Sequence, residues 1–205
     1  MTEIVRLNRS NTSYFRVIAN LHCKEISGGV LSIFGEEFLV ILYRYISEAP
    51  NCGIWVSEDC GVFKGFICGC ADDKKMFRRV LMRGFFPLVI VGLRAIRRPG
   101  VVSGVINVVK VLLKSKHDEL FTRAQLLSLA VNSLSREKGI GRSLVRAFEI
   151  ELDIWGVDEY LVWTTDWNLG ALRFYESNGF RRALTGQHST GDMVGLLKSR
   201  TSFTS

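Results

Sequence analysis

The sequence predicts an α/β domain in which a mixed central sheet is flanked by helices. Short runs in which apolar residues alternate indicate strands, and between them apolar residues recur every third or fourth position, as on one face of a helix. A glycine turn, Gly139-Ile140-Gly141, separates a run typical of a strand from one typical of a helix. The chain has 205 residues and no internal repeat or low-complexity tract, so one domain spanning residues 1–205 is expected.

The N-terminal half is expected to contain strands on either side of two helices. The Gly28-Gly29 pair marks the end of the first helix, and helical spacing of Leu39, Leu42 and Ile46 supports the second. Residues Glu58 to Gly61 form a hairpin signal between the next two strands. The expected elements are a strand at Ile4–Leu7, a helix from about Ser10 to Ile26, a helix at Gly35–Ser47, and strands at Cys52–Ser57 and Val62–Cys70.

A strongly basic segment follows at residues 74–116. It contains eleven Lys and Arg and no Asp or Glu, whereas the whole chain has a net charge of only +7. The sequence predicts three helices here, at Met76–Met82, Pro87–Arg97 and Val101–Lys114. The apolar run Phe85–Leu93 is about half of the roughly 20 residues that cross a bilayer, so no transmembrane helix is expected.

Two interpretations of this basic segment remain open. In the first interpretation, the helices pack an apolar face on the core or on another subunit, as in a homodimer, and their basic faces lie in solvent. Alternatively, the segment attracts an anionic partner, either a membrane surface or a substrate that carries phosphates. Nucleic acid is not expected as a partner, because a charge block alone lacks a recognisable element that reads bases.

The C-terminal half alternates strands and helices from residue 125 onward. The turn at Gly139 and Gly141 is expected to expose backbone N–H groups at a helix start, where the helix dipole attracts an anion such as the phosphates of a nucleotide-like cofactor. The expected elements are strands at Gln125–Val131 and Tyr160–Thr164, helices from the glycine turn to Leu152 and from Asn168, and strands at Arg182–Thr185 and Met193–Leu197 joined by a turn at His188–Gly191.

Two common phosphate-binding motifs do not explain the glycine turn. A P-loop requires four residues between its first glycine and Gly-Lys-Ser/Thr, and no such string occurs. A dinucleotide-binding fingerprint starts directly after a strand, whereas here the seven residues from Asn132 to Lys138 intervene. Both classes of site are therefore excluded.

Two motifs together resemble the GNAT superfamily of acetyl-CoA-dependent N-acetyltransferases. Arg136-x-x-Gly139-x-Gly141 is similar to the superfamily's pyrophosphate loop, and Asn168-x-x-Ala171-x-x-Phe174-Tyr175-Glu176-x-x-Gly179-Phe180 is similar to its second signature. The resemblance covers roughly the last 80 residues. It implies a GNAT-type acyl-CoA N-acyltransferase fold, in which residues 74–116 are a basic helical insertion between strands 3 and 4.

The resemblance also implies a site for acetyl-CoA. The pantetheine arm would lie between the strands that end at Val131 and Thr164, which splay apart, and Tyr175 would protonate the departing thiolate. A phenol suits this role because its pKa near 10 keeps it protonated at neutral pH. The residues implied in cofactor binding are Leu129, Ala130, Val131, Arg136, Lys138, Gly139, Ile140, Gly141, Arg142, Ser143 and Asn168.

The general base is left open by the sequence. Many superfamily members place a glutamate on the fourth strand, but the corresponding residue is Gln125, which cannot take up a proton. We rank His22 first because it falls beside the loop that is expected to border the acceptor. The alternatives are a water relay or one of Glu25, His117, Asp118 and Glu119, and the neighbouring Ser32 and Phe34 are candidates for substrate contact.

The remaining features exclude other classes of site. The five cysteines are odd in number and include no Cys-x-x-Cys pair, so neither a disulfide framework nor a metal site is expected. The N-terminus has no basic region followed by a long apolar one, so a cytoplasmic location is expected.

The predicted function is acetyl transfer to a primary amine of a small molecule by direct attack in a ternary complex. The N-terminal half loosely resembles bacterial members linked to surface-polysaccharide biosynthesis, which implies a nucleotide-linked amino sugar as the acceptor. The alternatives are acetylation of a protein N-terminus or lysine, and a non-catalytic module that binds coenzyme A or a membrane.

Overall fold

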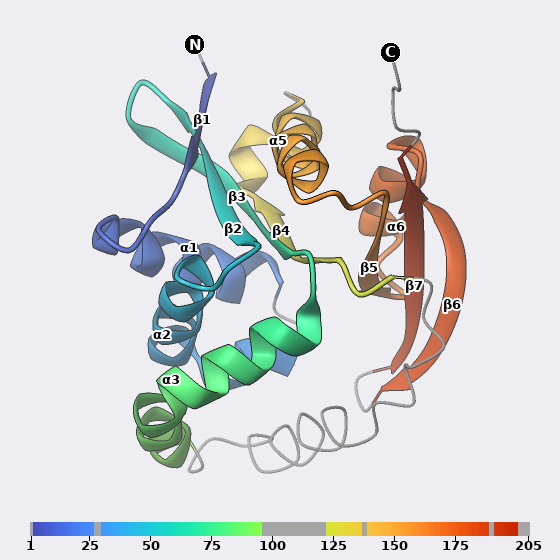
Figure 1. Ribbon diagram of the computed structural model, residues 1–205. Coiled ribbons are helices and arrows are strands. Elements are labelled where there is room, and N and C mark those ends of the chain that lie inside the picture. The colour runs from blue at the N-terminus through green and yellow to red at the C-terminus, as the bar shows by residue number, and fades with distance from the viewer. Residues whose placement is uncertain (1, 27–29, 96–121, 137–138, 189–190, 201–205) are drawn as a thin grey trace.

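The computed structural model describes residues 2–26, 30–95, 122–136, 139–188 and 191–200 (Figure 1). Within these ranges a seven-stranded sheet has the order β1-β2-β3-β4-β5-β7-β6, and every neighbouring pair is antiparallel except β4 and β5. This confirms the mixed sheet. The strands are β1 Thr2–Arg6, β2 Cys52–Asp59, β3 Val62–Cys70, β4 Gln125–Val131, β5 Glu159–Thr165, β6 Arg181–His188 and β7 Gly191–Ser199.

Helices cover both faces of the sheet, and each face has its own apolar cluster. Side chains alternate along β3, so that Phe66 packs into the cluster formed with α1 and α2, whereas Ile67 packs into the cluster formed with α5 and α6. The helices are α1 Thr12–Glu25, α2 Glu36–Ser47, α3 Asp73–Ala95, α5 Ile140–Ile154 and α6 Leu169–Ser177, and two 3-10 turns that the sequence did not predict lie at Val30–Phe34 and Ser133–Ser135.

The hairpin between β2 and β3 confirms the predicted turn. Its two central residues, Cys60 and Gly61, both have positive φ angles, of 51° and 75°. This backbone twist matches the twist of the two flanking strands, which favours a tight connection.

The basic segment differs from its prediction, because Met76–Met82 and Pro87–Arg97 do not form two separate helices. One helix, α3, runs from Asp73 to Ala95 with Pro87 inside it, and residues 96 and 97 lie outside the described residues. Helix α3 packs on α2, and Gly84 lies so close to Tyr45 that an added Cβ would be 2.9 Å from its ring. Burial of this face offsets the cost of an internal proline, about 3 kcal/mol. The third predicted helix, at 101–114, lies outside the described residues.

None of the described helices is long and apolar enough to span a membrane. The described cysteines form no disulfide, and the described ranges contain no group of three or more His, Cys, Asp or Glu residues that could hold a metal ion.

The parallel strands β4 and β5 separate after a short contact. They pair only at Gln125 with Leu161 and at Leu126 with Val162. Next to this contact β4 carries an extra residue, Leu127, opposite β3, and a bulge of this kind bends a strand. The C-terminal halves of the two strands therefore diverge and leave an opening in the middle of the sheet.

Candidate active site

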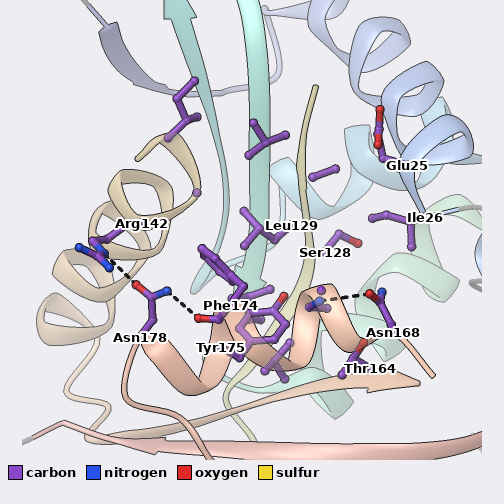
Figure 2. Close-up of a pocket in the computed structure, with 18 of the residues that line it drawn as sticks. Glu25, Ile26, Ser128, Leu129, Arg142, Thr164, Asn168, Phe174, Tyr175 and Asn178 are labelled. Atoms are coloured by element: carbon purple, nitrogen blue, oxygen red, sulfur yellow. Dashed lines mark hydrogen bonds between the residues drawn. The ribbon is translucent and has the colours of Figure 1, made fainter. Parts of the chain in front are cut away.

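A cavity of about 730 Å³ occupies the opening between β4 and β5. Its wall is formed by the end of α1, the strands β4 and β5, the loop after β4, the start of α5, and α6 (Figure 2). Most of the predicted site residues meet here. They are Leu129, Ala130, Val131, Arg136, Gly139, Ile140, Gly141, Arg142, Asn168 and Tyr175.

The backbone of β4 presents a free edge to this cavity. Asn132 donates its N–H to the Lys64 carbonyl on the β3 side, at 2.8 Å. Backbone groups alternate sides along a strand, so those of Ala130 also face β3, whereas those of Leu129 and Val131 face the opening. An extended chain with amide groups, such as pantetheine, has the shape and polarity to add to this edge.

The glycine turn opens α5 toward the same cavity, and its two glycines are required for different reasons. Gly139 has a φ of 74°, in the left-handed region that favours glycine. At Gly141 an added Cβ would lie 3.0 Å from the ring of Phe174, so the start of α5 approaches α6 closely only because glycine is there. The first N–H groups of a helix have no partner within it, and here they face a cavity that suits an anion.

Two residues that were predicted to bind the cofactor at this turn, Lys138 and Ser143, are not among the described residues that line the cavity. The Ser143 N–H donates to the Gly139 carbonyl at 3.0 Å, and Ser143 does not line the cavity. Its N–H therefore closes the first turn of α5, and its predicted contact with the cofactor stays a prediction. Lys138 lies outside the described residues.

A hydrogen-bonded chain holds Arg142 at the rim of the cavity (Figure 2). Arg142 Nε donates to Asn178 Oδ1 at 3.3 Å, and Asn178 Nδ2 donates to the Phe174 carbonyl at 2.7 Å. The sequence motif leaves the position of Asn178 undefined, so this residue was not predicted. Its place directly before Gly179, at the end of α6, was the available signal.

Asn168 and Tyr175 lie on the same helix. Asn168 Oδ1 accepts from the Ala171 N–H at 3.1 Å, so Asn168 is the N-cap of α6, at the position where the sequence predicted the helix to start. Tyr175 lines the cavity between Phe174 and the strands, and its ring packs against Phe180. Burial raises the pKa of the Tyr175 hydroxyl above its ordinary value, so the group is protonated at neutral pH and can only donate a proton there.

His22 does not lie in the cavity. It is 2% exposed, its Nδ1 is 2.6 Å from the Tyr43 hydroxyl, and burial lowers its pKa to about 4. Its Nε2 has no hydrogen-bond partner among the described residues. A buried neutral imidazole with this pKa is a weak base, so the structure does not support the prediction that His22 takes the proton from the amine.

Of the other residues considered as the base or for contact with the acceptor, only Glu25 lines the cavity among those that the structure describes. Glu25 lines the cavity and forms an ion pair with Arg136. Gln125 Nε2 donates to Asp73 Oδ2 at 2.8 Å, and neither residue lines the cavity. Ser32 Oγ donates to the Ile26 carbonyl at 2.6 Å, and Ile26 rather than Ser32 or Phe34 reaches the cavity. Residues 117–119 lie outside the described residues.

The chain matches the family model described as the acetyltransferase (GNAT) family over residues 23–180. No protein of curated function is significantly similar to it in sequence.

Solved structures of similar fold cover almost the whole chain. PaiA N-acetyltransferase from Thermoplasma acidophilum, in complex with coenzyme A, has a TM-score of 0.56 and 15% identity over 97% of this chain and 99% of its own. An N-acetyltransferase from Staphylococcus aureus Mu50 has a TM-score of 0.60 and 12% identity over 97% and 98%. The ribosomal-protein-S18-alanine N-acetyltransferase from Escherichia coli has a TM-score of 0.53 and 14% identity over 100% and 99%.

At these identities the structural matches show a shared fold, and the family match extends from α1 through both motifs. The cavity lies between the diverging strands and is bordered by the glycine turn. The chain is a member of the GNAT family of acetyl-CoA-dependent N-acetyltransferases.

Proposed function

We propose that this protein transfers the acetyl group of acetyl-CoA to a primary amine by direct attack within a ternary complex. One observation carries the proposal: a single cavity holds the free edge of β4, the start of α5 and the hydroxyl-bearing side chain of Tyr175. Holding two reactants beside an acid removes much of the entropic cost of their encounter.

Each part of the cavity has a role in this reaction. Acetyl-CoA supplies an acetyl group that is activated as a thioester. The backbone of Leu129 and Val131 binds and orients the pantetheine amides, and the same edge polarises the carbonyl that is attacked. The N–H groups at the start of α5, with Arg142, bind the pyrophosphate. The protonated hydroxyl of Tyr175 donates a proton to the departing sulfur.

For the acceptor, we propose a small molecule and place nucleotide-linked amino sugars first. The charge of the chain supports this choice, since residues 74–116 carry eleven basic and no acidic residues and an anionic carrier would be attracted to them. Protein N-termini are the rival class, because one enzyme of similar fold acetylates an alanine of ribosomal protein S18.

The decisive experiment measures binding and turnover separately. Isothermal titration calorimetry with acetyl-CoA tests the cofactor site, and detection of free thiol tests turnover with nucleotide-linked amino sugars, polyamines, amino acids and peptides. We expect saturable binding and turnover with at least one sugar amine. Absence of binding would refute the function, binding without turnover on any amine would indicate a non-catalytic module, and turnover on peptides alone would favour the protein-acceptor class.

The outer face of α3 favours an additional contact with an anionic membrane surface. It exposes the cations Lys75 and Arg78 beside Leu81 and Met82, whose exposed fractions are 42% and 77%. Basic residues next to apolar ones on one helix face are typical of helices that lie on membrane surfaces. Co-sedimentation with anionic but not with neutral vesicles, lost at high salt, is the expected result. Binding that is indifferent to lipid charge would contradict it.

A further inference from the structure

Glu25 places a carboxylate in the wall of the cavity. It is the last residue of α1, its side chain is 10% exposed, and it is the only acidic residue among the described residues that line this cavity. Figure 2 shows Glu25 and Ile26 on the side of the cavity opposite Arg142 and Asn178. The carboxylate therefore lies away from the rim that Arg142 and Asn178 form beside the pyrophosphate loop.

The position of Glu25 at the C-terminal end of α1 is not favoured by the helix itself. The C-terminal end of a helix carries partial negative charge, so an acidic residue there is unfavourable unless a cation compensates it. The cation is Arg136, whose side chain is 58% exposed and which belongs to the loop between β4 and α5. The ion pair joins α1 to the loop that is proposed to bind the cofactor's pyrophosphate.

Glu25 and a bound pyrophosphate would compete for the same guanidinium. Arg136 lines the same cavity as Gly139, Ile140 and Gly141. A guanidinium binds phosphate oxygens through two parallel hydrogen bonds, and a pyrophosphate carries more charge than one carboxylate. Binding at the start of α5 would therefore draw Arg136 away from Glu25 and leave a carboxylate in the cavity without its cation.

On the basis of the function proposed above, we propose that Glu25 receives the acceptor amine and that the cofactor's pyrophosphate releases it for this role by taking over Arg136. The acceptor arrives as R–NH₃⁺ and transfers one proton to the Glu25 carboxylate, which leaves a lone pair on nitrogen. That nitrogen forms the new bond to the acetyl carbon while the carbon–sulfur bond breaks. The sulfur takes the Tyr175 proton, and the second proton of the amine restores Tyr175.

This arrangement defines the acceptor and the order of binding. A carboxylate freed in the cavity selects a primary alkylamine, which is cationic in solution, over an aromatic amine or a hydroxyl group. Ser128 and Thr164 add hydroxyl groups to the cavity wall, and both are largely buried. Before the cofactor binds, Arg136 neutralises Glu25, so the cofactor binds first.

The test compares two variants that each lose one ion pair. Glu25→Gln removes the competitor for Arg136, so coenzyme A should bind about 2- to 5-fold more tightly by calorimetry, as expected for a partly exposed pair. Turnover of an alkylamine should fall by about 100-fold or more. The control is Glu151→Gln, which breaks the pair with Arg6 outside the cavity at similar exposure, 13% and 48%, and should change neither quantity.

Each outcome bears on one proposal. Coenzyme A affinity that is unchanged or weaker in Glu25→Gln, or turnover that is retained, overturns the role of Glu25 while leaving the proposed function intact. A wild-type protein that does not bind coenzyme A overturns the proposed function instead. Should the Glu25→Gln variant fail to fold, Glu25→Asp replaces it in the test, because aspartate keeps the charge but has a shorter side chain. Full turnover by Glu25→Asp together with unchanged coenzyme A affinity would also overturn the proposed role of Glu25.

Discussion

The buried imidazole of His22 makes the stability of this protein depend on pH. Burial lowers the pKa of His22 from 6.5 to about 4 in the folded state. The unfolded chain therefore binds a proton as the pH falls through about 6.5, whereas the folded protein does so only near pH 4. Between these values the unfolded state holds more protons, so the free energy of unfolding decreases as the pH falls. From about pH 7.5 to 5.5 these two pKa values predict a loss of about 1.4 kcal/mol from this residue.

Urea unfolding, followed by tryptophan fluorescence at both pH values, measures this loss. Over the same interval His22→Asn should lose about 1.4 kcal/mol less stability than the wild type. The carboxylates and the other histidines contribute equally to both proteins, so the difference reports His22 alone. The ring signals of His22 in NMR titration of the wild type give a direct check and should show no protonation above about pH 5. Equal losses in the two proteins, or a ring that titrates near 6.5, would show that burial does not hold His22 neutral.

Three further substitutions test the cavity. Tyr175→Phe should lower turnover by roughly 10- to 100-fold with unchanged affinity for coenzyme A, and unaltered turnover would remove the acid assignment. Gly141→Ala should destabilise the protein by about 1–3 kcal/mol in urea unfolding, because its Cβ meets the Phe174 ring at 3.0 Å; a gain in stability, usual for Gly→Ala within a helix, would contradict that contact. Asn168→Ala should cost about 1 kcal/mol through loss of the cap on the Ala171 N–H, and a smaller loss in Asn168→Asp would identify the cap as the cause.

Local patterns predicted most of the elements near the site. The strand Gln125–Val131 was predicted with its observed ends, because alternating side chains and flanking polar residues are contained in the segment itself. The glycine turn at Gly139 and the helix start at Asn168 were also predicted from the chemistry of single residues. Most residues predicted to hold the cofactor line one cavity, while their binding roles stay predictions.

Long-range packing accounts for the predictions that failed. The sequence predicted that a new helix starts at Pro87, but α3 continues through this residue because its face packs on α2. His22 was ranked as a base from its place beside a loop, whereas its side chain turns into the core toward Tyr43. A position along the chain does not show which way a side chain points.

The sequence alone determined the family motifs, the glycine turn and the order of strands and helices, because each depends on residues that are neighbours along the chain. Only the tertiary structure decided that Glu25 meets Arg136, 111 residues away, and that β4 separates from β5 to open the cavity. Both depend on how the helices and the bulged strand pack against each other, and the free energy of such packing comes from surfaces that are far apart in the sequence.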